Sequence, residues 1–597
     1  MKTFVADFET TTTPDKTHVW AWAVCEVGNS ENVITGTTID TFMEWCQSLP
    51  YNPKILFHNL RFDSQFILYW LFHNSFEHVE DSKDRASKTF TTLISNKGLY
   101  YSLEVVYYLK GKKIKKTTFQ DSLKLIPLSV DAIAKSFNLP IQKLKIDYSA
   151  HNDLPEGSPL TPEEEEYIKH DVQIVAHAVE YFYSEGLDKM TIGACALNEY
   201  KNIIKKKNFN TWFPTPKFHE DVKQSYRGGF TYLNPKFAGK TIRNIVVLDV
   251  NSLYPSVMYD SYLPYGTPIF FKGEYKDDWV YPIYTQMLRC KFDLKPGKIP
   301  TIQIKKSLIF SSNEYLTSSN GEIVPLCLNS VDLELFLSHY DVTNLEYLSG
   351  WKFKATRGLF TEYIDKWSNN KIQAKKDGNH GLYLLSKLFL NSLYGKFGTD
   401  TKVKSKIPYL DKDSDIVRYY DSETQHKKGV YVAMASFITS YARLKTILAA
   451  QQITDDYNSG KSNIQFVYAD TDSLHCLSPD FKLPEGLDID STKLGAWDHE
   501  ASAGASKFLR QKCYIENHII SKEDYENGLK GEKAHLYSKD EFGYYCLKIT
   551  VAGMPANCHS QVTFENFKIG ASYTGKLQPK VVQGGTVLKT VDFTIQK

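Results

Sequence analysis

Residues 467–476 read VYADTDSLHC and set two aspartates into an otherwise apolar stretch that is typical of a β-strand. Neighbouring carboxylates repel each other and resist burial, so the pair indicates a functional demand such as a bound cation. On an undistorted strand Asp470 and Asp472 would share one face. A tight hairpin at Thr471 would break that alternation, so we expect Asp472 to be the direct metal ligand and Asp470 to shape the site.

Two other segments carry chemistry that fits this pair. The stretch IVVLDVNSLYP predicts a buried strand that ends at Asp249, followed by a turn whose backbone amides and Ser252 could cradle phosphate oxygens. In KLFLNSLYG, three polar residues fall at helical spacing and share a face: Lys387, Asn391 and Tyr394. A lysine there can neutralise phosphate, and an aromatic ring can form a wall against a base pair. The plainer interpretation is an amphipathic core helix with one snorkelling lysine.

The first part of the chain holds a separate acidic constellation. DFET places two carboxylates on one face of a predicted strand, and YIKHD places two polar groups on one helix face. With HNLRFD, these pieces contribute Asp7, Glu9, Asn59, Asp63, Tyr167 and Asp171. Carboxylates gathered in this way need divalent cations, and oxygen ligands favour magnesium or manganese. Two such ions are the usual apparatus of phosphodiester hydrolysis.

Composition narrows the class of protein without identifying a partner. The 597 residues require more than one hydrophobic core. The net charge of +2 neither indicates nor excludes a polyanion, although basic residues cluster at 111–116, 205–207 and 402–406. Nine cysteines without a CxxC pair favour a reducing compartment. We expect neither a signal peptide nor a membrane span, and therefore a soluble intracellular protein.

The hydrophobic pattern predicts several elements. Thr161 followed by Pro162 is a typical helix start, and many short strands broken by Pro and Gly are expected over residues 261–357. The remaining expectations are a strand leading into a helix over 55–70, helices over 161–184, 360–376 and 382–397, and a helix over 431–456 before the hairpin.

The motifs together resemble a known family. DVNSLYP (249–255), KLFLNSLYG (387–395) and YADTDS (468–473) resemble motifs A, B and C of family B DNA polymerases. YRGG (226–229) and KCY (512–514) resemble two further motifs of that family. The acidic trio near the start resembles the exonuclease motifs of DnaQ-like proofreading domains. Over essentially the whole chain, the sequence resembles the protein-primed subgroup of the bacteriophage phi-29 type.

This resemblance implies a multidomain α+β fold, a right hand of palm, fingers and thumb with an N-terminal DnaQ-like, RNase H-like 3′–5′ exonuclease domain and two insertions. The implied boundaries are 1–189 for the exonuclease, 190–260 and 432–540 for the palm, 261–357 for the first terminal-protein-region insertion, 358–397 for the fingers, 398–431 for the second insertion, and 541–597 for the thumb.

The resemblance also implies roles at the exonuclease site. Asp7, Glu9, Asp63 and Asp171 would be metal ligands, and Tyr167 would orient the attacking water. A catalytic lysine would be Lys143, with Lys145 as the alternative. The residues implied to hold the primer end are Thr10, His58, Asn59, Phe62, Ser122 and Leu123. His58 could equally be a hydrogen-bonded core histidine.

At the polymerase site, the resemblance implies metal binding by Asp249, Val250 and Asp472, with two Mg²⁺ ions per site and Mn²⁺ able to substitute. The residues implied to bind the deoxynucleoside triphosphate are Ser252, Tyr254, Lys371 (or Lys375), Lys387, Asn391 and Tyr394. Those implied to bind DNA are Tyr226, Arg227, Gly228, Gly229, Thr439, Arg443, Lys512 and Tyr514.

The implied function is a protein-primed phage replicative DNA polymerase with proofreading and strand displacement. Its partners would be template and primer DNA, a terminal protein and a single-stranded DNA-binding protein, and it would act in the host bacterial cytoplasm as a monomer or as a heterodimer with terminal protein. A nucleotide-primed plasmid or virus polymerase is the narrower alternative. A nuclease with a degenerate polymerase half conflicts with intact motifs A to C, and a non-catalytic DNA clamp leaves both acidic clusters unexplained.

Overall fold

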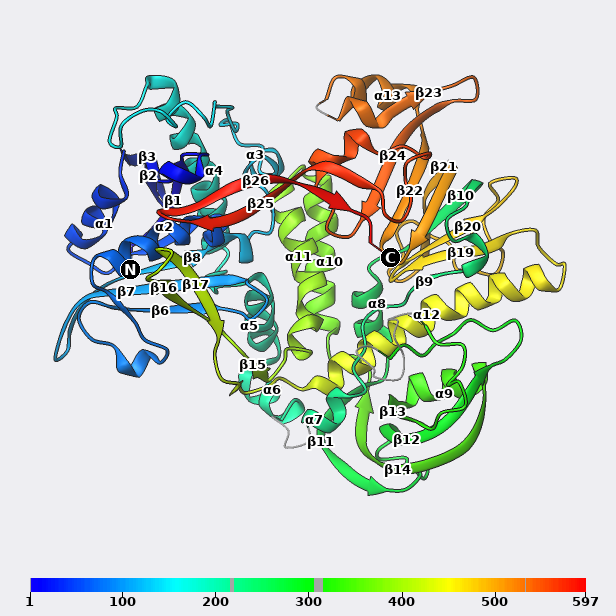
Figure 1. Ribbon diagram of the computed structural model, residues 1–597. Helices are drawn as coiled ribbons and strands as arrows, with labels where there is room; N and C mark the ends of the chain where they lie inside the picture. The colour runs from blue at the N-terminus through cyan, green and yellow to red at the C-terminus, as the bar shows by residue number, and fades with distance from the viewer. Residues whose placement is uncertain (1, 215–218, 305–314, 532, 597) are drawn as a thin grey trace.

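The computed structural model describes residues 2–214, 219–304, 315–531 and 533–596. Three larger sheets are joined by long central helices, and two β-hairpins extend back across the first sheet (Figure 1). All nine cysteines are free thiols. Among the described helices, none is both long enough and apolar enough to cross a bilayer.

The first sheet is mixed and has the strand order β3-β2-β1-β4-β8-β7-β6-β5. β4 runs parallel to both β1 and β8, which brings the carboxyl ends of these three strands to one edge. Its strands are β1 (Thr3–Thr10), β2 (Val19–Glu26), β3 (Asn29–Gly36), β4 (Lys54–Phe57), β5 (Glu77–His78), β6 (Thr89–Ile94), β7 (Tyr100–Lys110) and β8 (Lys113–Asp121). The helices of this region are α1 (Ile39–Ser48), α2 (Leu60–His73), α3 (Val130–Ser136) and α4 (Pro162–Ser184).

Helix α4 begins where the sequence predicts. The Thr161 hydroxyl accepts from the Glu164 amide at 3.3 Å, and the Glu164 carboxylate accepts from the Thr161 amide at 2.8 Å. This capping box, with Pro162 at the first helical position, satisfies amides that the helix itself leaves unpaired. The helix packs on β1, β2 and β3, so its buried face carries polar residues to the end of β1.

The second sheet is antiparallel and has the order β23-β24-β22-β21-β10-β20-β19-β9. The predicted hairpin is present, with Thr471 at a left-handed φ of 66° between β19 and β20. The strands are β9 (Thr231–Leu233), β10 (Thr241–Val250), β19 (Gln465–Asp470), β20 (Ser473–Leu477), β21 (Trp497–Arg510), β22 (Cys513–Ile520), β23 (Tyr537–Lys539) and β24 (Tyr544–Val551). The sequence-based boundary at 540 falls between two adjacent strands of this sheet.

The central helices include the predicted pair, α10 and α11, which pack against each other. α12 is buried along most of its length and contacts α8, α11 and β19. These helices, with the shorter ones around them, are α5 (Ile192–Ile204), α6 (Lys206–Trp212), α7 (His219–Lys223), α8 (Leu253–Asp260), α10 (Thr361–Lys376), α11 (His380–Phe397), α12 (Val432–Asn458) and α13 (Lys522–Leu529).

The third sheet corrects the prediction of many short strands over residues 261–357. Its order is β11-β14-β12-β13, and β14 alone runs for 17 residues. Register shifts allow the long strands to curve, and at Gly350 a Cβ would collide with the Thr285 carbonyl. Its elements are β11 (Leu263–Lys272), β12 (Ile283–Leu294), β13 (Val324–Asn329), helix α9 (Ser330–His339), which the sequence analysis missed, and β14 (Tyr340–Thr356).

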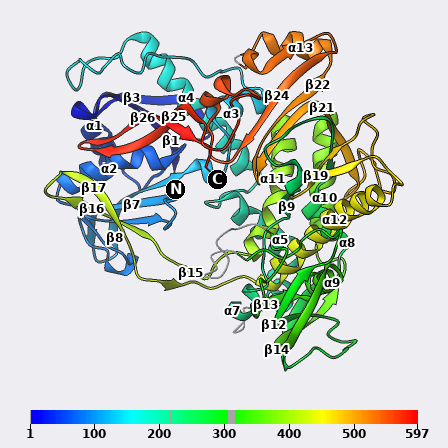
Figure 2. The same cartoon turned by 45° about the vertical axis from the view of Figure 1, so that its right-hand side comes forward.

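Two hairpins distant in sequence meet on α2 (Figures 1 and 2). Asp415, in the turn of the first hairpin, accepts hydrogen bonds from Tyr69 at 2.7 Å and Gln583 at 2.8 Å, and lies 3.0 Å from His73. Its carboxylate therefore links α2 to both hairpins. The hairpin strands are β16 (Lys406–Asp411) with β17 (Ile416–Asp421), and β25 (Ser572–Val582) with β26 (Gly585–Thr594); short β15 (Lys402–Val403) and β18 (Gln425–His426) pair beside the first.

Candidate functional site

The first acidic cluster gathers at the end of β1. One carboxylate oxygen each from Asp7, Glu9 and Asp171 lie within 4.8 Å of one another. Burial and the neighbouring charge of Asp171 raise the pKa of Asp7 to about 7, against the lowering effect of Lys143. Burial first, then the charges of Asp7 and Asp171, raise the pKa of Glu9 well above its usual range. The carboxylates thus lack sufficient positive charge from the protein itself.

This donor set fits divalent cations. Asp63, from α2, is buried, and burial together with the charge of Asp7 raises its pKa. Asp171 Oδ1 is buried and has no hydrogen-bond partner among the described residues. All four side chains offer oxygen atoms, the ligands that magnesium and manganese prefer. A cation at this position would satisfy both the charge and the unpaired oxygen.

Lys143 is the lysine that reaches this cluster. Its ammonium contacts the Asp171 carboxylate and lies 3.4 Å from the Tyr167 hydroxyl. The Tyr167 hydroxyl also lies 3.0 Å from that of Tyr148, which the sequence analysis did not single out. The contact with Asp171 fits the role implied for Lys143, which stays a prediction with Lys145 as the alternative.

The residues implied to hold a primer end line the entry to α2, but some serve as scaffold. His58 lies 3.0 Å from Ser122 Oγ and 2.6 Å from the Leu128 carbonyl, so it fits the alternative of a hydrogen-bonded core histidine. Asn59 has a left-handed backbone at the N-cap of α2, and its amide donates to Asp121. Of the other residues implied to hold the primer end, Phe62 is half-buried and Thr10 is buried. The amide of Leu123 also donates to Asp121. Asp121 was missed because only the fold brings it beside Asn59.

The second acidic cluster lines a cavity of about 380 Å³ at the end of β10 and the β19–β20 hairpin. Asp249 and Asp472 both face it. Burial first, then the charges of Asp472 and Glu500, raise the pKa of Asp249 to about 7. Burial also raises the pKa of Asp472. Val250, next to Asp249, is buried, and its amide donates to the Asp472 carbonyl at 2.8 Å, which ties the two strands together.

Two carboxylates in this cavity carry lysine partners. The Lys512 ammonium contacts Asp470, and Lys548 Nζ lies 3.3 Å from Glu500. The first pair gives Asp470 a cationic partner within the protein, and the unequal roles of Asp470 and Asp472 stay a prediction. The sequence did not indicate Glu500 and Lys548, because they lie on β21 and β24 and are not part of a motif with recognisable residue spacing.

An aromatic pair stands beside the cavity. The rings of Tyr254, on α8, and Tyr394, on α11, are stacked with centroids 4.1 Å apart and an interplanar angle of 17°. A Cβ at Gly229 would come within 3.1 Å of the Tyr254 hydroxyl and closer still to Thr471, so this position requires glycine. Ser252 has a left-handed backbone where α8 begins.

The lysines of α10 and α11 extend from the central helices. Lys387 and Asn391 are exposed on the face of α11 that also carries Tyr394. On α10, Lys371 is half-buried and Lys375 is exposed. The structure does not distinguish which of these two lysines would bind the triphosphate.

Several residues implied to bind DNA are bonded within the protein. Arg443 is 3% exposed; it donates to the carbonyls of Arg227 and Gly228 at 2.9 and 2.7 Å and pairs with Asp332. Arg227 donates to the Cys327 carbonyl at 3.1 Å. The buried Thr439 donates to its own helix. Arg443 therefore holds the shape of the 226–229 loop.

The other residues implied to bind DNA differ in exposure. Tyr226 is half-buried, and its ring lies where a Cβ at Gly398 would be. Tyr514 is buried and stacks on Phe508 with centroids 5.2 Å apart. Lys512 has a left-handed φ of 56° at the turn before β22, and its amide donates to the Tyr468 hydroxyl at 2.9 Å. Lys512 therefore presents its ammonium from a fixed backbone.

The fold and both clusters define a class of enzyme. The family described as DNA polymerase type B, organellar and viral, matches residues 46–158 and 153–483. The chain belongs to this family and is a DNA-directed DNA polymerase. Polymerases of this kind use divalent cations and deoxynucleoside triphosphates.

Individual relatives match the whole chain. The DNA polymerases of Bacillus phages B103 and phi29 are each 42% identical to it, covering 100% of this chain and 100% and 99% of theirs. That of Streptococcus phage Cp-1 is 32% identical, covering 100% of this chain and 98% of its own. The structure of phi29 DNA polymerase complexed with primer-template DNA and incoming nucleotide substrates has a TM-score of 0.90 at 41% identity, with both chains fully covered. These matches confirm the predicted family and the right-hand fold with its exonuclease domain.

Proposed function

We propose that this protein is a protein-primed replicative DNA polymerase of a phage, with 3′–5′ proofreading and strand-displacement activity. The observation that carries the proposal is the presence of two separate acidic clusters in one chain, each at the edge of its own sheet. Synthesis and removal of a nucleotide need different geometries around the primer end, so two centres suit an enzyme that does both.

Nucleotide addition takes place at the cavity of Asp249 and Asp472, which would hold two magnesium ions. When bound, such ions would supply charge neutralisation for the triphosphate and lower the pKa of the primer hydroxyl. Tyr254 lies beneath the incoming sugar, and its ring, buttressed by Tyr394, excludes a 2′-hydroxyl. Lys512 holds the primer strand, and Lys387 neutralises phosphate charge.

Proofreading takes place at the cluster of Asp7, Glu9, Asp63 and Asp171. These carboxylates would hold the divalent cations for hydrolysis, while Tyr167 orients the attacking water and Lys143 balances the charge of Asp171. The hydrogen bond of 3.0 Å between the Tyr148 and Tyr167 hydroxyls supports a fixed position for the Tyr167 hydroxyl.

Strand displacement depends on the hairpin of residues 406–421. This hairpin rests on α2 and on the β25–β26 hairpin, linked at Asp415. A closed arrangement of this kind supports a role in holding the template while excluding the displaced strand.

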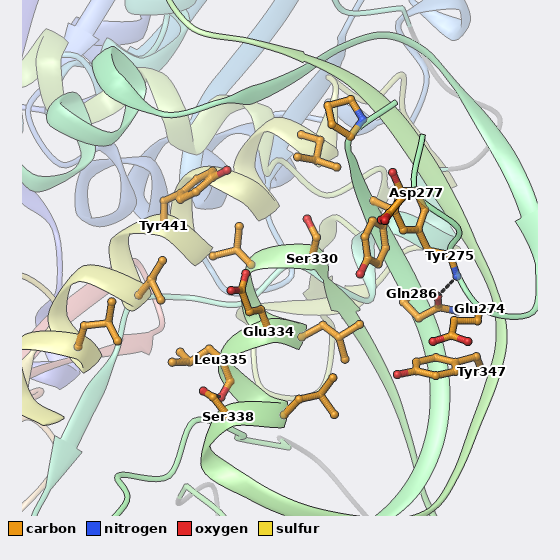
Figure 3. Close-up of a pocket in the computed structure, with 18 residues that line it drawn as sticks. Glu274, Tyr275, Asp277, Gln286, Ser330, Glu334, Leu335, Ser338, Tyr347 and Tyr441 are labelled. Carbon is orange, nitrogen blue, oxygen red and sulfur yellow. Dashed lines mark hydrogen bonds between the residues drawn. The ribbon is translucent and has the colours of Figure 1, made fainter. Parts of the chain in front are cut away.

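The priming protein docks on the region of the third sheet. A cavity of about 790 Å³ lies there between α9, β12 and α12 (Figure 3). Glu274, Asp277 and Glu334 line it together with tyrosines including Tyr275 and Tyr347, and none of its described lining residues is positively charged. This lining supports a partner surface that carries basic side chains.

Protein priming is distinguished from nucleotide priming by one experiment. The protein is incubated with Mg²⁺, labelled dATP, template and a candidate terminal protein. Covalent label on a protein hydroxyl is the expected result, and Asp472→Ala should abolish it. Extension only of nucleic-acid primers would favour the alternative, a nucleotide-primed plasmid or virus polymerase.

A further inference from the structure

The long connection between α3 and α4, residues 137–161, supplies two side chains to the first acidic cluster. This α3–α4 loop contains no helix or strand. Lys143 contacts the Asp171 carboxylate, and the Tyr148 hydroxyl lies 3.0 Å from that of Tyr167. Loops of this length without secondary structure are usually functional, so the contacts that hold this loop in place bear on the chemistry of the cluster.

The loop has one buried anchor. Every residue of the loop is described, and among them only His151 is buried, with an exposure of 3%. Its ring is stacked on that of Trp20, on β2, with centroids 4.0 Å apart and an interplanar angle of 3°. His151 Nε2 also lies 3.0 Å from Glu164 Oε1. The imidazole therefore joins the loop to the first sheet and to the first turn of α4.

Glu164 receives this contact as a member of the capping box of α4. Burial would raise the pKa of Glu164, but hydrogen bonds from Thr161 and His151 hold it below its usual range. An ionised carboxylate only accepts hydrogen bonds, so His151 Nε2 is the donor. The same carboxylate thus caps the helix and fixes the loop. Tyr167 and Asp171 lie about one and two turns further along α4.

A second anchor joins the loop to the end of β1. The Thr12 amide donates to Asn152 Oδ1 at 2.8 Å, and Asn152 Nδ2 donates to the Thr12 hydroxyl at 2.7 Å. Thr12 lies just beyond β1, the strand that supplies Asp7 and Glu9. Two adjacent residues of the loop are therefore bonded to both elements that form the cluster, the strand and the helix.

The turn that contains both anchors also restrains Tyr148. Asp147 Oδ1 accepts from the Ser149 amide at 2.9 Å and from the Ser149 hydroxyl at 2.6 Å. The Asn152 amide donates to the Ser149 carbonyl at 3.0 Å. Because these local bonds connect Tyr148 to His151 through a short turn, a shift of the anchor moves the tyrosine as well.

We propose that His151 and Asn152 are positioning residues for the exonuclease reaction: they anchor the α3–α4 loop so that Lys143 and Tyr148 stay in place at the acidic cluster. The inference rests on the proposed proofreading function of that cluster. Neither anchor residue belongs to the cluster itself. Both act through Lys143 and Tyr148, whose contacts with α4 depend on where the loop lies.

The rest of the loop is held less firmly than its anchors. Its apolar side chains are only partly buried against the core, and Tyr148 is 50% exposed. Misplacement of a catalytic group by 1 Å can slow a reaction about 100-fold. We therefore expect the anchors to govern the rate of excision and not the affinity for DNA.

The test measures single-turnover 3′–5′ degradation of single-stranded DNA by His151→Ala, Lys143→Ala and the variant that carries both changes. His151→Ala should lose about 10- to 100-fold in rate, while its affinity for the strand, measured by fluorescence anisotropy, should change less than about twofold. Lys143→Ala should lose about 100-fold. The double variant should be no slower than Lys143→Ala, because both changes disturb the same contact. Extension of matched primers should stay normal.

A second readout depends neither on activity nor on a bound metal. Hydrogen exchange of the metal-free protein, followed by mass spectrometry, reports on the hydrogen-bonded amides of residues 149–154. These amides should exchange about tenfold faster or more in His151→Ala, and those of the first sheet should not change. Such a local effect would distinguish a released loop from a destabilised domain.

Three further variants separate positioning from a folding defect. Asn152→Ala removes a half-buried side chain and should slow excision in the same way; it replaces His151→Ala in every measurement if that variant does not fold. His151→Gln keeps a nitrogen donor near the position of Nε2 and should recover part of the lost rate. Asp153→Ala, an exposed change in the same turn, is the matched control and should excise at the normal rate.

Additive losses in the double variant would overturn the proposal, because they would show that His151 does not act through Lys143. Normal excision by His151→Ala, Asn152→Ala or Lys143→Ala would overturn it as well. Asp7→Ala with Glu9→Ala, run in parallel, reports on the proposed function itself. If that variant still degrades single strands, the cluster is not the exonuclease site, whatever the loop variants do.

Discussion

The Lys512 ammonium contacts the Asp470 carboxylate in the cavity that Asp249 and Asp472 also line, and this pair separates the two aspartates of the 467–476 hairpin. Asp470 already has a cation from the protein, whereas Asp472 and Asp249 have raised pKa values and no ion pair among the described residues. This difference supports our prediction that Asp472, and not Asp470, is the metal ligand.

Asp472→Ala should abolish nucleotide addition, with a loss of about a thousandfold or more, because a metal ligand is removed. Degradation of single-stranded DNA should continue. Primer extension and 3′–5′ degradation, measured on the same preparation, check this. Asp480→Ala, an exposed aspartate beyond the hairpin, serves as the control and should extend normally. Extension by Asp472→Ala at a near-normal rate would show that the motif is misassigned.

Asp7→Ala combined with Glu9→Ala should have the opposite effect. Two of the carboxylates at the end of β1 are lost, so mismatched primer ends should persist while matched ends are extended at the normal rate. A mismatch-excision assay measures the difference, with exposed Asp15→Ala as a matched control. If the double variant still excised mismatches, hydrolysis would have to occur elsewhere.

Tyr254→Val should weaken discrimination against ribonucleotides by about 100-fold, because the stacked ring beneath the sugar is replaced by a smaller group. Incorporation of deoxynucleotides should be nearly retained. Competition between rNTP and dNTP on one template gives the ratio. Unchanged discrimination would mean that another side chain excludes the 2′-hydroxyl.

Deletion of residues 402–426 should spare filling of short gaps but severely shorten rolling-circle products. Asp415→Ala should cause a milder form of the same defect, since it removes only the link between α2 and the two hairpins. Product lengths with and without a downstream strand separate displacement from synthesis. Equal displacement by the deletion variant and the intact protein would contradict the role assigned to the hairpin.

Glu516→Gln should reduce stability at neutral pH by about 1–3 kcal/mol, because a charged hydrogen bond to His475 is weakened. The folded-state pKa of Glu516 is lowered from its ordinary 4.5, so its contribution is complete above pH 4.5 and declines as the pH falls below that value. Urea unfolding from pH 7 to pH 3 should therefore show the two proteins converging on the acidic side. A constant difference across this range would contradict the ionised state of Glu516.

Local patterns in the sequence were enough for much of this structure. The capping residues at Thr161 and Pro162 located α4, and the sequence around Thr471 predicted the tight hairpin turn. These features depend on neighbours within a few residues, where backbone preferences and side-chain periodicity act directly.

Pairings between distant strands could not be predicted in the same way. Glu500 on β21 and Lys548 on β24 form an ion pair although β22 lies between their strands. Glu516 contacts His475 only because the strand order and register of the second sheet bring them together. Arg443 looked like a DNA contact by resemblance, yet it is 3% exposed and bonded to the loop of Arg227. Burial of a long charged side chain depends on partners from other segments, such as Asp332 on α9, which a linear pattern does not reveal.

The link at Asp415 also sets an order of events in biosynthesis. Its partners Tyr69 and Gln583 lie 346 and 168 residues away along the chain, on opposite sides of it. A nascent chain can fold the first sheet early and bury the inner face of α2, but the face of α2 that meets the hairpins stays uncovered until the residues around 583 have been synthesised. Any stall before that point leaves this face of α2 open to solvent.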